Sequence, residues 1–271
     1  MKNKPPEHRA RKRFGQNFLH DQGIIERIVR SVNAQASDNI VEIGPGQGAI
    51  TAPLLQACSR LNVIEIDRDL IPILLAQFAK YPDFNIHQQD VLTFDFKTLI
   101  NETPLRVIGN LPYNISTPLI FHLLEYTNSI RDMHFMLQKE VVQRLAADVG
   151  DKHYGRLTIM VQYYCAVEHL FAVPPECFNP QPKVDSAIVR LIPHASIPFV
   201  AKDFKGFAAL VNASFGQRRK TLRNTLKNLM PAEQLARLHD ELGIDPTLRP
   251  EKISIQQFVT LSNFIYDNTS D

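Results

Sequence analysis

The sequence has no tryptophan and only three cysteines among its 271 residues, and it contains no long apolar run. A membrane-spanning helix needs about 18 consecutive apolar residues, so we expect no such segment. The basic N-terminal residues also lack the apolar stretch of a secretory signal. Cys58, Cys165 and Cys177 form no CxxC pair and cannot all pair with one another. We therefore expect buried free thiols in a cytoplasmic protein.

Acidic residues are scarce in two segments, although the formal net charge of the whole chain is only +2. Residues 1–20 contain six Lys and Arg against one acid, and residues 202–227 contain seven against one. The rest of the chain is therefore acidic. Two basic blocks on an acidic body are typical of a protein that binds a polyanion. Charge alone leaves open the alternative that both blocks are ordinary solvated surface.

The hydrophobic pattern predicts an α/β domain. With 44% hydrophobic residues the chain can bury a core, and its length suits two domains. Four short apolar runs that predict parallel strands cover residues 39–43, 61–66, 85–87 and 105–108, with helix-length stretches such as 49–57 and 70–78 between them. Two later runs alternate polar with apolar residues, at 165–173 and 185–192, and predict partly antiparallel strands.

The C-terminal part changes to a helical pattern. Helical periodicity covers residues 204–214, 220–229, 231–242 and 254–266. We therefore expect two domains: an α/β domain at residues 1–197, with a basic N-terminal arm at 1–20, and a helical domain at 198–271.

A glycine-rich turn follows the first predicted strand. Gly44, Gly46 and Gly48 form a GxGxG pattern, in which the absence of Cβ atoms lets the backbone approach a ligand. A dinucleotide-binding turn needs GxGxxG, so the spacing favours a smaller nucleoside ligand. A nicotinamide-dependent oxidoreductase is the disfavoured alternative.

Acidic residues close the second and third predicted strands. Glu65 and Asp67 follow one strand and Asp90 follows the next, so all three lie at the edge of the sheet where open α/β sheets bind ligands. A carboxylate there can accept hydrogen bonds from both ribose hydroxyls, and we assign that role to Glu65. Asp90 is placed to accept a hydrogen bond from an adenine amino group.

The segment NLPYN at residues 110–114 follows the fourth strand and resembles the motif of adenine-N6 methyltransferases. The lone pair of an adenine N6 is delocalised into the ring. Hydrogen bonds accepted by the Asn110 side chain and a backbone carbonyl near Leu111 favour a pyramidal nitrogen. Pro112 fixes φ and removes a donor, and Tyr113 offers a stacking face for the base.

Seven segments occur in one order along the chain: QNFL, EIGPGQG, VIEID, QQD, NLPYN, FNPQPKVDS and SFGQRRKTLRN. In this combination the chain resembles the KsgA/RsmA family of ribosomal RNA small-subunit adenine dimethyltransferases. The resemblance implies a Rossmann-like class I methyltransferase sheet with a small C-terminal all-helical domain. It implies S-adenosylmethionine as methyl donor, no metal ion, and action as a monomer.

The implied substrate is 16S ribosomal RNA in the small ribosomal subunit or its precursor. Two adjacent adenosines in the loop of a 3′-terminal hairpin are each dimethylated at N6. A role as an assembly factor that recognises an immature subunit is the other possibility, and the two are compatible.

The resemblance also carries site residues onto matching positions. Those implied to bind the cofactor are Asn17, Leu19, Gly44, Gly46, Glu65, Asp90 and Asn110. Those implied to act on the target base are Asn110, Leu111, Pro112, Tyr113 and Phe178. Phe178 is expected to face Tyr113 across the flipped base.

RNA affinity is expected to come from the second basic block. Its candidate RNA-binding residues are Arg218, Arg219, Lys220, Arg223 and Lys227. On the predicted helix at 220–229, the spacing of four between Arg219, Arg223 and Lys227 forms one basic stripe. Leu222, Leu226 and Leu229 form the neighbouring apolar face.

Overall fold

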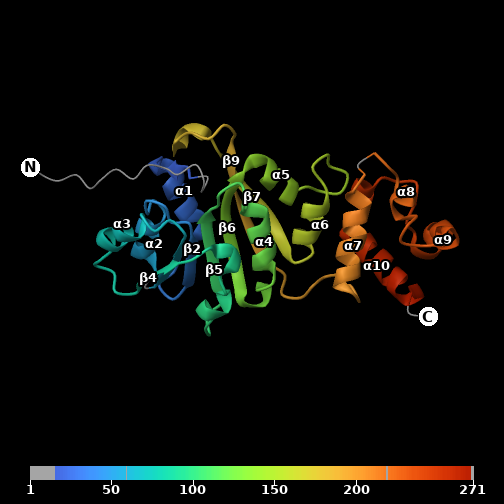
Figure 1. Cartoon of the computed structure of the whole chain (residues 1–271), viewed down its shortest axis with the longest axis horizontal. Coiled ribbons are helices and arrows are strands. Elements are labelled where there is room, and N and C mark those ends of the chain that lie inside the picture. Colours follow the sequence, from blue (N-terminus) through green and yellow to red (C-terminus); the bar gives the residue numbers. More distant parts are fainter. Residues whose placement is uncertain (1–15, 59, 218, 270–271) are drawn as a thin grey trace, which may run out of the picture. The chain divides into compact units, whose positions relative to one another are not determined.

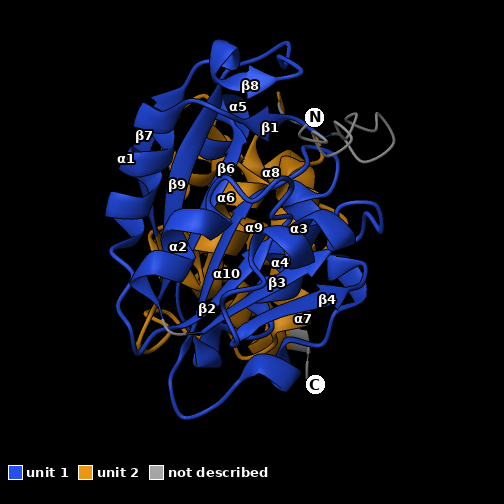
Figure 2. Ribbon diagram, turned by 90° about the vertical axis from the view of Figure 1, so that its left-hand side faces the viewer, with its two compact units in different colours: residues 1–142, 167–193 blue, residues 143–166, 194–271 orange. Residues whose placement is uncertain are grey.

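The computed structural model describes residues 16–58, 60–217 and 219–269 (Figure 1). They form two compact units (Figure 2). The first unit consists of the described residues of 1–142 together with 167–193, and the second of 143–166 together with the described residues of 194–271.

A seven-stranded sheet forms the centre of the first unit. Its strands, in spatial order, are β4 (Phe84–Gln88), β3 (Leu61–Glu65), β2 (Asn39–Ile43), β5 (Leu105–Asn110), β6 (Ile130–Gln138), β9 (Ser186–Pro193) and β7 (Cys165–Val173). The pairs from β4 to β6 are parallel, whereas β6 and β9 are antiparallel. The predicted α/β fold, with parallel strands followed by a partly antiparallel edge, is thus confirmed. β6 is the strand that the apolar pattern did not predict.

Helices and short strands complete this unit: α1 (Gln22–Val32), α2 (Thr51–Ala57), α3 (Ile71–Gln77), α4 (Ser116–Leu124), β1 (Phe18–Leu19) and β8 (Phe178–Asn179). Aliphatic side chains on one face of the sheet pack against buried residues of α1, α2 and α3 in a single core cluster. Residues at alternate strand positions, such as Val41 and Val107, are also fully buried, so both faces of the sheet are covered.

The cysteine prediction is confirmed for burial. Cys58, Cys165 and Cys177 are free and buried. Burial raises the pKa of Cys58 to about 11 and that of Cys165 to about 12, so both stay protonated thiols at neutral pH. Among the residues that the structure describes, no helix is both long and apolar enough to span a membrane.

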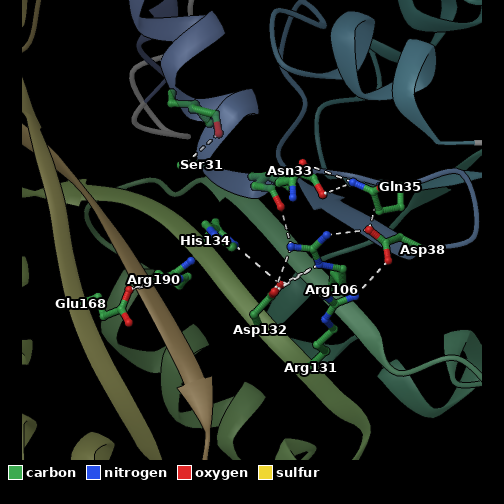
Figure 3. Close-up of polar contacts among 12 residues, drawn as sticks. Ser31, Asn33, Gln35, Asp38, Arg106, Arg131, Asp132, His134, Glu168 and Arg190 are labelled. Atoms are coloured by element: carbon green, nitrogen blue, oxygen red, sulfur yellow. Dashed lines mark hydrogen bonds and ion pairs between the residues drawn. The ribbon is translucent and has the colours of Figure 1, made fainter.

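A buried ionic network ties α1, β2, β5 and β6 together at the amino end of the strands (Figure 3). Arg106 is 3% exposed and donates to Asp38 (2.6 Å), Asp132 (2.9 Å) and the Val32 carbonyl (2.6 Å). Burial acts to raise the pKa of Asp38, but hydrogen bonds from the Gln35 N–H and Arg106 outweigh it and lower that pKa. The network fixes the end of the sheet opposite the strand ends from which the ligand site was predicted.

The second unit is helical and includes residues from two parts of the chain. Its helices are α6 (Arg156–Gln162), α7 (Phe204–Phe215), α8 (Leu222–Leu226), α9 (Ala232–Leu242) and α10 (Ile255–Thr269), and α5 (Lys139–Leu145) ends in it. The ring of Tyr163 lies 5.6 Å from that of Phe204 and 5.0 Å from that of Phe207. Tyr154 donates to the Ile253 carbonyl at 3.0 Å. These contacts group residues 143–166 with the C-terminal helices. The predicted boundary at residue 197 instead assigns residues 143–166 to the α/β domain.

The predicted basic helix at 220–229 is wrong in extent. Helix α8 covers only Leu222–Leu226, because the backbone N–H groups of Leu222 and Arg223 bond to the carbonyls of Leu248 and Pro246 at 2.8 Å instead of continuing an upstream helix. Arg219 lies in the turn before α8 and shares no helical stripe with Arg223, whereas Lys227, at the C-cap with a right-handed helical backbone, lies one helical turn after Arg223 as predicted.

The predicted apolar face of this segment is confirmed for two of its three leucines. Leu222 and Leu226 are buried as predicted, but Leu229 is 39% exposed. Arg218 lies outside the described residues.

Candidate active site

A cavity of about 280 Å³ opens at the carboxyl ends of the parallel strands. Five chain segments line it: residues 16–19, 42–50, 64–66, 89–91 and 110–115. Of the predicted site residues, ten line this cavity: Asn17, Leu19, Gly44, Gly46, Glu65, Asp90, Asn110, Leu111, Pro112 and Tyr113. Segments far apart in sequence thus meet where open α/β sheets bind their ligands.

The glycine-rich turn adopts a backbone that few other residues tolerate. Gly44 and Gly46 have φ of +66° and +57°. A Cβ on Gly46 would lie 3.0 Å from the ring of Phe18, so glycine also lets the segment at 16–19 close over the turn. The cavity wall here consists of backbone rather than side chains.

Glu65 ends strand β3 and is only 5% exposed. Its Oε1 accepts a hydrogen bond from the Asp67 N–H at 2.8 Å. Burial raises the pKa of Glu65, and the N–H groups of Asp67 and Gly46 oppose that rise. A carboxylate has about four lone-pair sites, so Glu65 retains capacity to accept from a ligand. Asp67 is fully buried and accepts from the Gln16 side chain at 3.0 Å.

Glu42 is a second buried carboxyl group in the cavity wall, and sequence reasoning gave it no role. It is 2% exposed, and Thr51 donates to its Oε2 at 2.6 Å. Burial, opposed by this hydrogen bond and reinforced by the nearby charge of Glu65, raises the pKa of Glu42 to about 7. Its place directly before the glycine turn, two residues ahead of Gly44, was the available signal.

The raised pKa of Glu42 predicts a specific pH dependence of stability. The contribution of Glu42 to the free energy of unfolding becomes less favourable as the pH rises from 4.5 to about 7, because Glu42 is ionised in the unfolded chain but still protonated in the folded one. Glu42→Gln is therefore expected to raise the free energy of unfolding by up to about 3 kcal/mol at pH 8 and to change it little at pH 4.5. Urea unfolding at both pH values measures this, and equal effects at the two pH values would contradict it.

Two further cavity residues follow strand ends: Asp90 comes after β4, and the apolar Ile66 comes after β3. Asp90 is exposed, and its Oδ1 caps the following short helix by accepting from the Leu92 N–H at 3.0 Å. Ile66 is 45% exposed and also lines the cavity. An apolar face between two carboxylates suits a flat heterocycle that carries hydroxyl and amino groups on its periphery.

The geometry around Asn110 fixes which way its side-chain amide points. Asn110 ends strand β5, and its Nδ2 donates to the Asn17 backbone carbonyl at 3.0 Å. With the donor group committed to that carbonyl, the amide oxygen is the atom left to accept from a ligand. The Leu111 N–H bonds to the Met136 carbonyl at 3.2 Å and holds the next residue to strand β6.

Tyr113 and Phe178 lie in different surroundings. Tyr113 lines the cavity and is half-buried. Phe178 is 4% exposed, pairs with Leu19 in the two-stranded sheet β1–β8, and belongs to the core cluster. Phe178 is not one of the described residues that line the cavity. Its role as a second stacking face stays a prediction.

Comparison with known proteins identifies close relatives over the whole chain. The family model described as ribosomal RNA adenine dimethylase matches residues 7–267. The chain is 64% identical to the ribosomal RNA small subunit methyltransferase A of Saccharophagus degradans, over 98% of this chain and all of that protein. It is 60% identical to the protein of the same name from Pseudomonas fluorescens, over 95% of this chain and 93% of that one.

Solved structures agree with these sequence relatives. A dimethyladenosine transferase from Plasmodium falciparum is 28% identical, with a TM-score of 0.79 over 93% of this chain and 98% of that one. The 23S rRNA methyltransferase ErmE, at 24% identity, shares the fold with a TM-score of 0.74 over 92% of this chain and all of that one. Together with the matched family model, these similarities exclude the nicotinamide-dependent alternative. The chain belongs to the ribosomal RNA adenine dimethylase family.

Proposed function

We propose that this protein transfers methyl groups from S-adenosylmethionine to N6 of two adjacent adenosines in the 3′-terminal hairpin loop of 16S ribosomal RNA. The observation that carries the proposal is the cavity, in which the Asn110 side chain and the glycine turn lie together with the carboxyl groups of Glu42, Glu65 and Asp90. The names of the sequence relatives support the small-subunit RNA as substrate.

The residues of the cavity fit S-adenosylmethionine. Glu65 is placed to accept from the ribose hydroxyls, and Asp90 to accept from the adenine amino group beside the apolar face of Ile66. A Cβ at Gly46 would press against the ring of Phe18, which also lines the cavity. Asn17 and Leu19 close the cavity from the side of β1. When bound, the donor supplies an activated methyl group on a sulfonium, and the proposed chemistry uses no metal ion.

The protein's part in the reaction is then chiefly to position the base. In the first transfer, the Asn110 amide oxygen and a backbone carbonyl near Leu111 accept from the two N6–H bonds of the target adenine, which frees the nitrogen lone pair; the monomethylated amine offers one N–H for the second transfer. Tyr113 stacks on the base and contributes about 1–3 kcal/mol. Positioning accounts for about 7–11 kcal/mol of barrier lowering, against about 3–5 kcal/mol for a general base. The proton leaves to water after transfer.

We assign RNA affinity to the exposed cations in and around α8 of the second, helical unit. Arg219, Lys220, Arg223 and Lys227 are exposed, and in the described part of the chain none of them forms an ion pair with an acid. Lys202 and Arg237, by contrast, pair with Asp267 and Glu241. Cations outside salt bridges are available to contact phosphates and so to release counterions, although Arg223 also lies near enough to Asp245 to contribute to lowering the pKa of that carboxyl.

Replacing Arg219, Arg223 and Lys227 together with Gln is expected to reduce the salt dependence of RNA binding. Three lost phosphate contacts lower the slope of log K against log salt by about two. Fluorescence titration of labelled RNA at several salt concentrations measures the slope. A matched control replaces Arg190, Lys202 and Arg237, which already pair with acids, and is expected to leave the slope unchanged. Equal slopes for the test variant and the wild type would refute the assignment.

Mass spectrometry of small-subunit RNA tests the proposed function in cells. In cells that lack this chain, the two adenosines are expected to be unmethylated, and its return is expected to restore both dimethyl groups. Full methylation without the chain would contradict the proposal.

A further inference from the structure

The hydroxyl of Tyr113 lies 2.8 Å from the hydroxyl of Ser186. Ser186 is the first residue of strand β9 and is 1% exposed. It does not line the cavity, whereas Tyr113 does. The hydrogen bond therefore joins a cavity-wall side chain to a buried residue of the sheet.

Three neighbouring strands set this contact through their register. Asn110 of β5 lies opposite Met136 of β6, and Gln138 of β6 lies opposite Ser186 of β9. The Lys139 N–H extends the β6–β9 ladder by bonding to the Asp185 carbonyl at 3.0 Å. The turn after β5 thus delivers Tyr113 to the start of β9. Because strand register is hard to shift when both faces of a sheet are buried, the position of Ser186 is rigid.

Tyr113 is held at both ends of its side chain. At the backbone end, the Ser116 hydroxyl donates to the Tyr113 carbonyl at 3.2 Å. At the ring end, the phenol bonds to Ser186. Burial raises the pKa of Tyr113, opposed by the hydrogen bond with Ser186, so the phenol stays neutral at physiological pH. A side chain held at two points keeps the direction of its long axis when a base arrives.

We propose that Ser186 is a positioning residue that holds the long axis of the Tyr113 side chain in the direction from which its ring stacks on the target adenine. This inference rests on the proposed function. Ser186 acts through Tyr113 and does not touch the base. Its effect falls on the alignment of the base with the methyl donor, and hence on kcat, rather than on the affinity for either substrate.

Two single variants and their combination test the proposal. Tyr113→Phe keeps the ring and removes the phenol, and Ser186→Ala removes the partner. Each is expected to lower kcat for methylation of unmethylated small ribosomal subunits by about tenfold, while KM for the subunits and Kd for the donor stay within twofold. The double variant is expected to lose no more than either single variant, because all three lack the same bond.

Ser214→Ala serves as the control for loss of a buried serine. Ser214 is fully buried and donates to the Leu210 carbonyl within α7 of the second unit. This variant is expected to retain wild-type kcat even where its melting temperature falls.

A Tyr113→Phe variant with wild-type kcat overturns the inference, and does so even where Ser186→Ala is too unstable to measure. Additive losses in the double variant also overturn it. Failure of the wild-type protein to methylate small subunits counts instead against the proposed function, so the two failures are distinguishable.

Discussion

Asn110→Ala is expected to lower kcat at least 1,000-fold, or about 4 kcal/mol in the activation barrier. In the wild-type protein, Asn110 Nδ2 donates to the Asn17 carbonyl at 3.0 Å, so the amide oxygen is free to accept from the target amine. The variant removes that oxygen. The proposed donor-binding residues Glu65, which ends β3, and Asp90, which follows β4, stay unchanged in this variant, so the affinity for S-adenosylmethionine is expected to fall by less than tenfold. Single-turnover methylation and calorimetric titration of the donor measure the two effects separately.

Two further variants sharpen this prediction. Asn110→Asp keeps an acceptor oxygen but loses the donor to the Asn17 carbonyl, so its kcat is expected to lie between those of wild type and Asn110→Ala. Asn85→Ala is the matched control, because Asn85 is exposed on β4 and outside the cavity. A kcat for Asn110→Ala above a tenth of the wild-type value would remove Asn110 from the mechanism.

The second large effect concerns stability. Arg106→Ala is expected to lower the free energy of unfolding by about 3–5 kcal/mol, because it removes the buried guanidinium that pairs with the carboxylates of both Asp38 and Asp132 (Figure 3). A loss of that size is a large fraction of the about 5–15 kcal/mol that stabilises a typical domain. Urea denaturation followed by circular dichroism measures it.

Arg131→Ala provides the control for this prediction. Arg131 also pairs with Asp38, at 3.2 Å, but its side chain is 58% exposed. Solvent screens such a pair, so the expected loss is about 0–1 kcal/mol. Equal losses for the two arginine variants would show that burial does not set the strength of the network.

The sequence was most informative where apolar runs were uninterrupted. β2 and β7 have the predicted bounds, and β3 to β5 differ from prediction by one or two residues. β6 escaped prediction because Asp132 and His134 interrupt its apolar pattern, although both are buried. Arg106 compensates Asp132, and His134 lies 3.7 Å from the same carboxylate, while burial lowers the pKa of His134 to about 4. Such polar burial depends on partners distant in sequence.

The candidate site was predictable because its residues sit on short motifs at strand ends. What the motifs could not reveal were contacts across the fold. Glu42 gains its raised pKa from burial beside Glu65, and Ser186 meets Tyr113 only through the register of three strands. The predicted extent of the basic helix was wrong for a similar reason. The N–H groups of Leu222 and Arg223 bond to the carbonyls of Leu248 and Pro246, which are distant in sequence.

The proposed reaction is tested most directly by incubating the purified protein with small ribosomal subunits that lack the modification and with isotopically labelled S-adenosylmethionine. Mass spectrometry of the 3′-terminal RNA fragment then locates the label. We expect two adjacent adenosines, each carrying two labelled methyl groups on N6, and no label when Asn110→Ala replaces the wild-type protein. Label at any other RNA position, or equal labelling by the Asn110→Ala variant, would contradict it.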